Sequence, residues 1–295
     1  MRYQLGTGLI AGQTTMILAA DEQLFHLGAL LAGYADAPTS LLALFEGWER
    51  WSVELPRVVA ERGIVRPLDP AAVTWLAPIL YPRKLICLGA NYKAHNVEMG
   101  FDDRPKFPYT FLKPPTTTLV GHRATVELPK LPKLIDWEAE LAVVIGTRAR
   151  DVAQADALQI VAGYSLFNDL SARDWVVDRS FLGMDWVMLK AYDGFGPFGP
   201  LITPASFIPD PDRLPIRSFV NDELMQDSNT ADQVFSVPEI IAHLTAIMTL
   251  EPGDVIVTGT PPGVGFGRKP PRFLSSGDCV TIEIDGLGRL ETTLR

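Results

Sequence analysis

From residue 85 onward the chain is a succession of short β-type runs separated by turns rich in proline and glycine. These runs are "LICLGANY", "TVELP", "WEAELAVVIG", "LITP", "IRSFVND", "DVIVTGT" and "CVTIEIDGLGRLETTLR". Between them only "DVAQADALQIVAGYS" and "VPEIIAHLTAIMTL" carry apolar residues at helical spacing. Helices this few cannot alternate with every strand, which argues against a doubly wound sheet or a (β/α)8 barrel. We therefore predict an α+β, β-rich fold, a mixed β-sheet roll with helices packed outside it.

Residues 1–75 differ from the rest and are predicted to form a small N-terminal domain. They begin with β-type sequence and continue with "SLLALFEGWERWSVELPRVVAERG", whose apolar residues recur at helical spacing. The following "VRPLDPAAVTWLAPILYPRK" contains four prolines and is typical of an extended connection. We place the boundary near residue 75 and expect residues 76–295 to form the main domain.

Composition excludes several classes of partner and site. A net charge of −9 disfavours binding to nucleic acid or to an anionic membrane. Residues 3–20 carry no charge, but their glycines and threonines leave no apolar run long enough for a signal-peptide core or a membrane span. Cys87 and Cys279 lack Cys-x-x-Cys spacing, so neither a disulfide framework nor a zinc site is predicted. We expect a soluble, cytoplasmic protein without nucleic-acid or membrane partners.

Acidic residues crowd together at the start of the predicted strand "DWEAELAVVIG". Because side chains alternate along a strand, Asp136, Glu138 and Glu140 are expected to share one face. A protein tolerates the repulsion between them either in open water or where a cation neutralises them. The rest of the strand is apolar on both faces, which favours a position of its acidic end near the core. A solvent-facing strand end remains the alternative.

A second acidic segment, "GYSLFNDLSARDWV", places Asp169 directly after a β-type run and four residues before Arg173. On its own, the Asn-Asp pair is typical of a turn. Oxygen ligands drawn from Glu138, Glu140 and Asp169 would suit Mg²⁺ or Mn²⁺ and leave coordination positions for water and substrate. No histidine or cysteine lies close enough in sequence to indicate zinc.

As a set, these segments resemble the fumarylacetoacetate hydrolase family, in particular its acylpyruvase and 2-hydroxyhepta-2,4-diene-1,7-dioate isomerase-like branch. The similar segments follow one another in order from residue 85 to about 266. They are "CLGANYKAHNVEMG", "FLKPPTTTLVG", "DWEAELAVVIG", "GYSLFNDLSARDW", "LKAYDGFGPFGPLITP", "VNDELMQ" and "LEPGDVIVTGTPPGVG". The resemblance implies a mixed β-roll core that commonly dimerises, with a divalent metal held by Glu138, Glu140 and Asp169.

One of the four histidines, His95, precedes Glu98 by three positions in "NYKAHNVEMG". Residues three apart on a helix lie on the same side, so the glutamate can orient the imidazole or a water molecule. Without the family resemblance, the pair would be interpreted as an ordinary surface feature. The resemblance implies that His95 and Glu98 are catalytic and lie on a short lid segment that orders over bound substrate.

Three further residues match functional positions of the family. Lys190, in "LKAYDGFGPFGP", matches the active-site lysine and is implied to serve catalysis and substrate binding, although serine and phenylalanine commonly follow this lysine in the family. Arg173 matches an arginine implied to bind substrate; the alternative is an ion pair with Asp174 or Asp178. Thr260 lies where a strand ends in the loop "TGTPPGVG", which offers a hydroxyl and backbone N–H groups to a substrate carboxylate.

The insert "VVDRSFLGMDWVML", between Arg173 and Lys190, is rich in tryptophan, methionine and phenylalanine. Two interpretations remain open for it. It lines a pocket for a bulky or apolar substrate, or it packs into the core, as large aromatic stretches more often do.

The resemblance also implies a class of reaction. Family substrates are typically 2,4-dioxo acids or their enols, and a divalent metal acts as a Lewis acid on the enolate. We therefore expect a metal-dependent hydrolase that cleaves a C–C bond of an acylpyruvate- or fumarylpyruvate-type acid, with His95 and Glu98 activating water. The alternatives are isomerisation of a 2-hydroxyhepta-2,4-diene-1,7-dioate-type diacid, decarboxylation of an oxo acid, and a non-catalytic metal-binding homologue. The expected partners are the oxo-acid substrate and a second copy of the chain in a homodimer.

Overall fold

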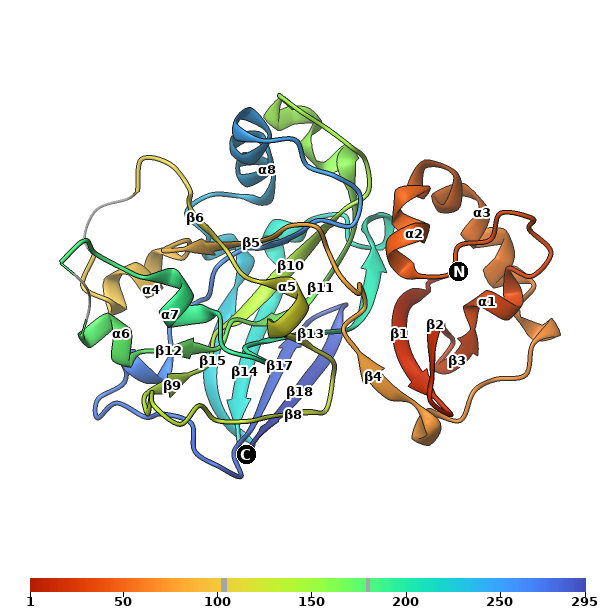
Figure 1. Cartoon of the computed structure of the whole chain (residues 1–295). Helices are drawn as coiled ribbons and strands as arrows, with labels where there is room; N and C mark the ends of the chain where they lie inside the picture. Colours follow the sequence, from red (N-terminus) through yellow and green to blue (C-terminus); the bar gives the residue numbers. More distant parts are fainter. Residues whose placement is uncertain (102–104, 179–180) are drawn as a thin grey trace.

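Two layers of β-structure form the body of the protein, and a smaller N-terminal part lies beside it in the computed structural model (Figure 1). The structure describes residues 1–101, 105–178 and 181–295. The predicted β-rich α+β class with a mixed sheet and flanking helices is confirmed. Among the described residues, no helix has the length and apolar character needed to cross a membrane.

The larger sheet runs through both parts of the molecule. Its strands in spatial order are β3 (Gln23–His26), β2 (Gln13–Ala20), β1 (Gln4–Ile10), β13 (Gly196–Pro204), β11 (Val161–Asn168), β10 (Ala139–Ile145), β16 (Val255–Val257), β5 (Leu85–Gly89) and β6 (Tyr109–Leu112). Off this path, β4 (Thr74–Leu76) pairs with β1 and β7 (Leu119–Val120) with β13. β16 pairs with β5 in parallel, while β10 and β11 are antiparallel. Every residue of β10 and β11 is buried, which explains their nearly continuous apolar sequence.

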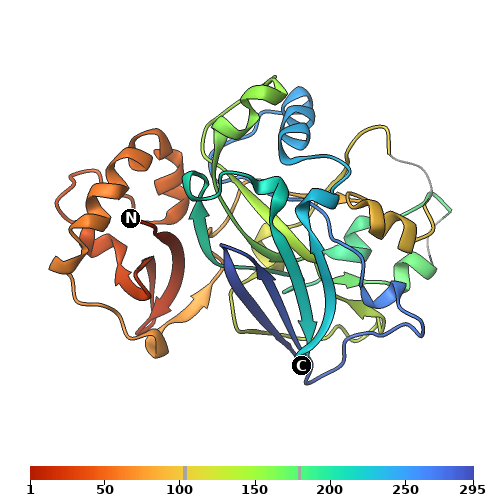
Figure 2. The ribbon, with the colours of Figure 1, turned by 180° about the vertical axis from the view of Figure 1, so that it is seen from behind.

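A second sheet covers one face of the larger one. Its strands in spatial order are β15 (Glu223–Asn229), β14 (Pro215–Val220), β17 (Cys279–Ile284), β18 (Gly288–Leu294) and β8 (Ala124–Val126). Burial alternates along β14, where Ile216, Ser218 and Val220 face inward. One apolar cluster joins Leu141 and Leu166 of the larger sheet to residues of β14, β17 and β18. Seen from behind (Figure 2), the cyan β14 and β15 and the blue β17 and β18 form the near side of this roll.

The α-helices are short and lie outside the sheets. They are α1 (Leu27–Leu30), α2 (Leu41–Glu46), α3 (Trp48–Ala60), α4 (Lys93–Glu98), α5 (Pro115–Thr118), α6 (Asp174–Val177), α7 (Trp186–Lys190) and α8 (Val237–Ile247). α8 confirms the helix predicted from the apolar spacing of "VPEIIAHLTAIMTL". The Ser236 hydroxyl accepts from the Glu239 N–H, and the Glu239 carboxylate accepts from the Ser236 N–H, a capping box that stabilises the helix by about 1 kcal/mol.

The predicted helix over residues 151–165 is wrong in its second half. A 3-10 helix, η3 (Gln154–Ile160), is followed at once by β11. Strand pairing prevails here over the local apolar spacing. An added Cβ at Gly163 of β11 would lie 2.4 Å from the Thr203 carbonyl oxygen of β13, so glycine allows the two strands to approach closely.

The predicted continuous strand through "DWEAELAVVIG" is also interrupted. β9 (Ile135–Asp136) pairs with β12 (Ser171–Ala172), whereas β10 begins only at Ala139 and pairs with β11. At the break, the Glu138 N–H donates to the side-chain oxygen of Asn168 at 3.1 Å instead of joining a ladder between strands. The strand pairing is therefore interrupted beside the end of β11.

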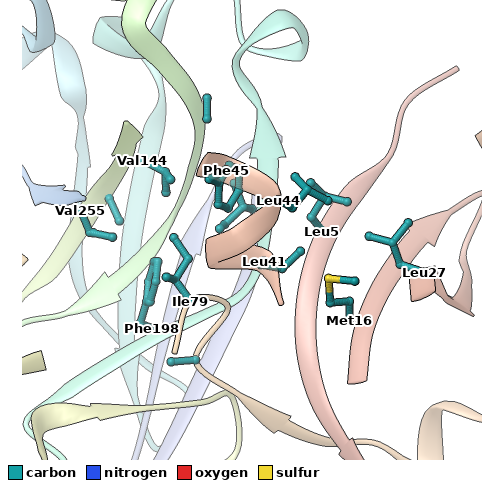
Figure 3. Packing of buried hydrophobic residues seen from close by; sticks show 14 of the residues in the cluster. Leu5, Met16, Leu27, Leu41, Leu44, Phe45, Ile79, Val144, Phe198 and Val255 are labelled. Carbon is teal, nitrogen blue, oxygen red and sulfur yellow. The ribbon is translucent and has the colours of Figure 1, made fainter. Parts of the chain in front are cut away.

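The N-terminal part shares a sheet and a core with the rest of the chain. β1 pairs with β13 through Leu5 and Ile202, so β1 to β3 extend the larger sheet. Figure 3 shows Leu44 and Phe45 of α2 between β1 and the side chains of Val144 and other residues of the body, and all of them belong to one buried cluster. The predicted boundary at residues 75 and 76 falls within β4, and the division into domains stays a prediction.

Candidate metal centre and active site

Three carboxylates meet where β10 begins and β11 ends, two neighbouring strands in the middle of the strand order of the larger sheet. Glu138 lies directly before β10, Glu140 within it, and Asp169 directly after β11. One carboxylate oxygen of each lies within 4.8 Å of the others. The residues are 6%, 0% and 0% exposed, respectively. The structure thus brings together the three acids that the sequence selected as metal ligands.

The state of Glu140 fits a bound cation. Its Oε2 accepts from the Gly259 N–H at 2.5 Å, but its Oε1 has no hydrogen-bond partner among the described residues. Burial, followed by the negative charges of Asp169 and Glu138, raises the pKa of Glu140 well above its usual range. A hard cation removes this penalty, and three carboxylate oxygens are the ligands that Mg²⁺ and Mn²⁺ prefer.

Two lysines complete the charged cluster. The Lys190 Nζ donates to Glu138 Oε2 and to Asp169 Oδ2, both at 2.6 Å. The Lys113 ammonium donates to the other Asp169 oxygen. Burial alone would raise the pKa of Glu138, but Lys190 and Arg173 lower it to about 2. Burial opposes the charge of Lys190, yet the attraction of Asp169 and Glu138 raises its pKa, so this lysine is charged.

Arg173 joins the carboxylate cluster to a neighbouring acid. Its Nε donates to Asp136 at 2.8 Å and its Nη2 to Glu138 at 2.5 Å, so its ion-pair partners are not Asp174 or Asp178. The arginine is 5% exposed and lines the cavity described below. Its guanidinium offsets the repulsion between Asp136 and Glu138, which are two positions apart along the chain.

Asp136 also fastens a loop to the cluster. Its carboxylate accepts from the Gly265 N–H at 2.6 Å and from the Phe266 N–H at 3.1 Å. An added Cβ at Gly265 would lie 2.8 Å from the same carboxylate, so glycine permits this close approach. Asp136 therefore orients both Arg173 and the loop that follows Thr260.

The His95–Glu98 pair lies together on α4. The His95 Nδ1 is 2.9 Å from Glu98 Oε2, and Glu98 Oε1 accepts from the Gly263 N–H at 2.9 Å. His95 is 8% exposed and lines the cavity. The glutamate thus orients the imidazole while it joins α4 to the loop "TPPGVG". The predicted mutual orientation is present, and the catalytic role stays a prediction.

Thr260 lies on the cavity wall, and its hydroxyl is already engaged. It donates to the Ala139 carbonyl at 3.0 Å and accepts from the Gln226 Nε2 at 2.8 Å. Gln226 also donates to the Pro261 carbonyl at 2.7 Å, and its Oε1 accepts from the Ala139 N–H at 3.1 Å. This fully buried amide therefore holds the strand end, the loop and β10 together.

Lys113 and Gln226 were absent from the sequence prediction. Their segments, "FLKPPTTTLVG" and "VNDELMQ", belong to the family-like set, but neither segment marks its polar residue as functional. Lys113 meets Asp169 across 56 positions, and Gln226 meets Thr260 across 34. Only the resemblance of these segments to the family could have indicated that the two residues belong to the site.

A cavity of about 220 Å³ opens beside the cluster. Its polar lining consists of His95, Asn96, Glu138, Arg173, Lys190 and Thr260. Its apolar and aromatic side chains are Leu88, Ala90, Met99, Phe101, Tyr109, Phe111, Val176, Met184, Trp186 and Leu189. The last four of these belong to the insert between Arg173 and Lys190, which favours the pocket interpretation of that segment; its residues 179 and 180 lie outside the described residues.

Known proteins resemble both the sequence and the structure. The family described as "Fumarylacetoacetate (FAA) hydrolase C-terminal" matches residues 84–295. An oxaloacetate tautomerase of Xenopus laevis, named as mitochondrial, is 43% identical over 223 residues, which cover 76% of this chain and 69% of the relative.

Solved structures give the same picture over the whole chain. A fumarylacetoacetate hydrolase from the psychrophile Exiguobacterium antarcticum is similar with a TM-score of 0.85 at 33% identity and covers 99% of both chains. A maleylpyruvate hydrolase from Sphingobium sp. SYK-6, solved with manganese(II) and pyruvate, is similar with a TM-score of 0.78 at 30% identity. That match covers 100% of this chain and 98% of the hydrolase.

Proposed function

The chain belongs to the fumarylacetoacetate hydrolase family, and we propose that it is a divalent-metal-dependent enzyme that acts on a 2-oxo acid through its enolate. The observation that carries this proposal is the convergence of Glu138, Glu140 and Asp169 beside a cavity that also presents Lys190 and Arg173. When bound, Mg²⁺ or Mn²⁺ supplies Lewis-acid stabilisation of the enolate oxygen. The manganese and pyruvate in the similar hydrolase support the same chemistry.

The reaction we propose first is C–C hydrolysis of a 2,4-dioxo acid. Water adds to the C4 carbonyl, the C3–C4 bond breaks, and a carboxylic acid and the enol of a pyruvate-type acid are released. Because the Glu98 carboxylate accepts at His95 Nδ1, that nitrogen carries the proton, and Nε2 is left to take a proton from water. A positioned base of this kind contributes about 10²- to 10⁴-fold to the rate.

Charged and polar groups of the cavity hold the acid end of the substrate. Lys190 and Arg173 are buried cations at the same end of the cavity and attract a carboxylate or the oxygens on which negative charge develops. Thr260 lies on the same wall, but its hydroxyl donates to the Ala139 carbonyl, so a donor role toward a substrate carboxylate requires this hydrogen bond to be exchanged. The presence of a base together with these cations argues against a protein that only binds metal.

Keto–enol tautomerisation of oxaloacetate is the second candidate, because the similar Xenopus protein is an oxaloacetate tautomerase. It requires the same enolate and a base beside C3, but no attacking water. Isomerisation of a hydroxydienedioate and decarboxylation of an oxo acid pass through the same kind of anion. We place C–C hydrolysis first because the apolar side chains of the cavity suit a substrate with one carboxylate and an apolar acyl group.

The test compares acetylpyruvate and oxaloacetate with purified protein that contains Mg²⁺ or Mn²⁺. Hydrolysis releases pyruvate from acetylpyruvate, whereas tautomerisation changes the enol absorbance of oxaloacetate without fragment release. Exhaustive chelation is expected to abolish either activity, and added metal to restore it. Turnover that survives complete removal of the metal contradicts the proposal.

We also propose that the enzyme is a homodimer in a reducing, cytoplasmic compartment. Dimerisation follows from the family resemblance, and light scattering on the purified protein tests it. Cys87 and Cys279 are both free, which suits a reducing environment; the Xenopus relative is named as mitochondrial. Fractionation of the cells that produce the protein tests the compartment.

A further inference from the structure

Three aromatic side chains form a wall of the cavity, here called the aromatic wall: Tyr109, Phe111 and Trp186. The Phe111 and Trp186 rings stack with centroids 4.2 Å apart and planes at 10°. Tyr109 meets Trp186 edge-on at 5.5 Å, and its hydroxyl accepts from the Trp186 Nε1 at 3.2 Å. The indole N–H is thus satisfied within the wall, which leaves a fixed apolar ring beside the cavity.

The aromatic wall begins directly beside the acid end of the cavity. The Lys190 Nζ lies 5.7 Å from the centroid of the Phe111 ring. Gly89 supplies space on the same side, because an added Cβ there would lie 3.3 Å from Tyr109 and 3.6 Å from Trp186. The rings thus lie within reach of the other end of a substrate whose carboxylate meets Lys190.

The charged side chains that line the cavity gather around Glu138. Among the described lining residues, the ionisable acid and base groups apart from the Tyr109 phenol are His95, Glu138, Arg173 and Lys190, and Arg173 and Lys190 both bind Glu138. Leu88, Met99 and Met184 add apolar surface around the wall. Both cations among the described lining residues are thus engaged at the acid end, so a second carboxylate at the wall loses its hydration without gaining either of them, whereas a flat apolar group gains burial and ring contacts.

We propose that the aromatic wall is a subsite for a planar apolar acyl group, aryl or conjugated, and that Trp186 makes the enzyme prefer such a group over a small or carboxylated one. This proposal rests on the proposed function, which places the acid end of the substrate at Lys190 and Arg173. It names the substrate class: a 2,4-dioxo acid with an aromatic or conjugated apolar tail. The competing explanation is that Phe111 and Trp186 only pack the core.

Binding of substrate analogues that cannot be cleaved tests the subsite without turnover. Oxamate carries only the carboxylate and the oxo oxygen, and N-phenyloxamate adds a planar ring. With Mn²⁺ present, titration calorimetry is expected to give about tenfold tighter binding of N-phenyloxamate than of oxamate to the unaltered protein. In Trp186→Ala this preference falls to about twofold or less, and Trp186→Phe keeps most of it.

Val187→Ala is the matched control, because this neighbour on α7 is 68% exposed and does not line the cavity. It is expected to leave the tenfold preference intact. Equal affinities for the two analogues in the unaltered protein overturn the proposal, and so does a full preference in Trp186→Ala. If Trp186→Ala unfolds, Phe111→Leu decides in its place: it is expected to lower the preference to about half or less, while Trp186→Phe keeps most of it, and a full preference in Phe111→Leu overturns the proposal.

The outcome also separates the subsite from the proposed function. A clear preference for N-phenyloxamate without metal-dependent turnover of any oxo acid refutes the proposed function and supports the subsite. Turnover of dioxo acids without such a preference refutes the subsite alone. Failure of both analogues to bind in the presence of Mn²⁺ counts against both.

Discussion

The two sides of the cavity are built in different ways. On one side lies the carboxylate set, here called the floor: Glu138 lines the cavity, and Glu140 and Asp169 lie buried behind it. β10 and β11 set their positions, and both strands have hydrogen-bonded neighbour strands on both sides. The cover consists of α4 and α7, helices of six and five residues. Helices this short are not stable alone, and side-chain bonds such as those from Glu98 to Gly263 and from Trp186 to Tyr109 hold them.

This difference assigns separate tasks to the two regions. Strand register fixes the floor, so its substitutions are expected to change metal affinity and the stability of the metal-free protein. Individual contacts hold the cover, so its substitutions are expected to change rate and selectivity while the metal remains bound. The following experiments test whether the floor controls metal affinity and the cover controls rate, beginning with the largest expected effect.

Glu140→Gln, on the floor, is expected to lower kcat/KM about a thousandfold, because a neutral amide replaces a carboxylate ligand. Titration with Mn²⁺ measures the accompanying loss of affinity. The metal-free variant is expected to be about 1 kcal/mol more stable than the unaltered protein at pH 7, because a buried and repelled charge is removed. Unchanged Mn²⁺ affinity in this variant would exclude Glu140 as a ligand.

His95→Ala, on the cover, is expected to lower kcat about a hundredfold at saturating metal, because the proton acceptor is lost. Glu98→Gln is expected to act in the same direction through the orientation of the imidazole. Mn²⁺ affinity, measured by calorimetry, stays within a factor of about two in both variants, since neither residue is in the set of converging carboxylates. A parallel loss of metal affinity would show that cover and floor are not independent.

Gly267→Ala tests how the cover is held. The added Cβ would lie 2.4 Å from the Glu98 carboxyl carbon, so the end of that side chain has to move away from His95. We expect about a tenfold loss of kcat and a change in unfolding free energy within about 0.5 kcal/mol, because a flexible side chain gives way. Gly33→Ala is the control, since its added Cβ meets nothing within 4 Å. Full activity of Gly267→Ala would show that Glu98 is not needed in this position.

His122 lies outside both regions, and its replacement is expected to change stability alone. Burial, partly offset by Glu291, lowers its pKa from 6.5 to about 4, and its Nδ1 accepts from the Glu291 N–H at 3.1 Å. Between these values the unfolded chain binds more protons than the folded one, so stability falls as pH drops from about 6.5 to 4. Denaturant unfolding at pH 7 and pH 4 is expected to show a loss about 1–3 kcal/mol larger in the unaltered protein than in His122→Asn. Equal losses would assign the acid sensitivity to other groups.

Local signals in the sequence predict much of the floor and little of the cover. Alternation along the predicted strand places Asp136, Glu138 and Glu140 on one face, and Asp169 directly follows a β-type run, so local patterns indicate the candidates. The family resemblance then implies Glu138, Glu140 and Asp169 as the set of ligands. Helix α8 was also predicted from a local pattern, the spacing of its apolar residues. By contrast, the docking of Glu98 onto Gly263 joins positions 165 residues apart, and no local pattern encodes it.

The sequence-based predictions were wrong or incomplete where contacts between segments far apart in the chain decide the local structure. Residues 161–165 have helical spacing, yet pairing with β10 and β13 makes them a strand. The break before Ala139 arises because the Asn168 side chain takes the Glu138 N–H. Lys113 was not predicted at all, because its partner, Asp169, lies 56 positions away at the end of another strand.

The pairing of β1 with β13 bears on how this protein can be shortened. The family match begins at residue 84, which invites expression of residues 84–295 as a separate unit. Such a truncation would remove the strand that pairs with β13 at Leu201 and Ile202. It would also expose to solvent the apolar residues that α2 now covers. Bare backbone at a strand border recruits other chains, so a trimmed protein would tend to associate into aggregates. Residues 1–75 thus support the metal centre indirectly, because β1 pairs with β13 and covers an edge of the sheet that contains β10 and β11.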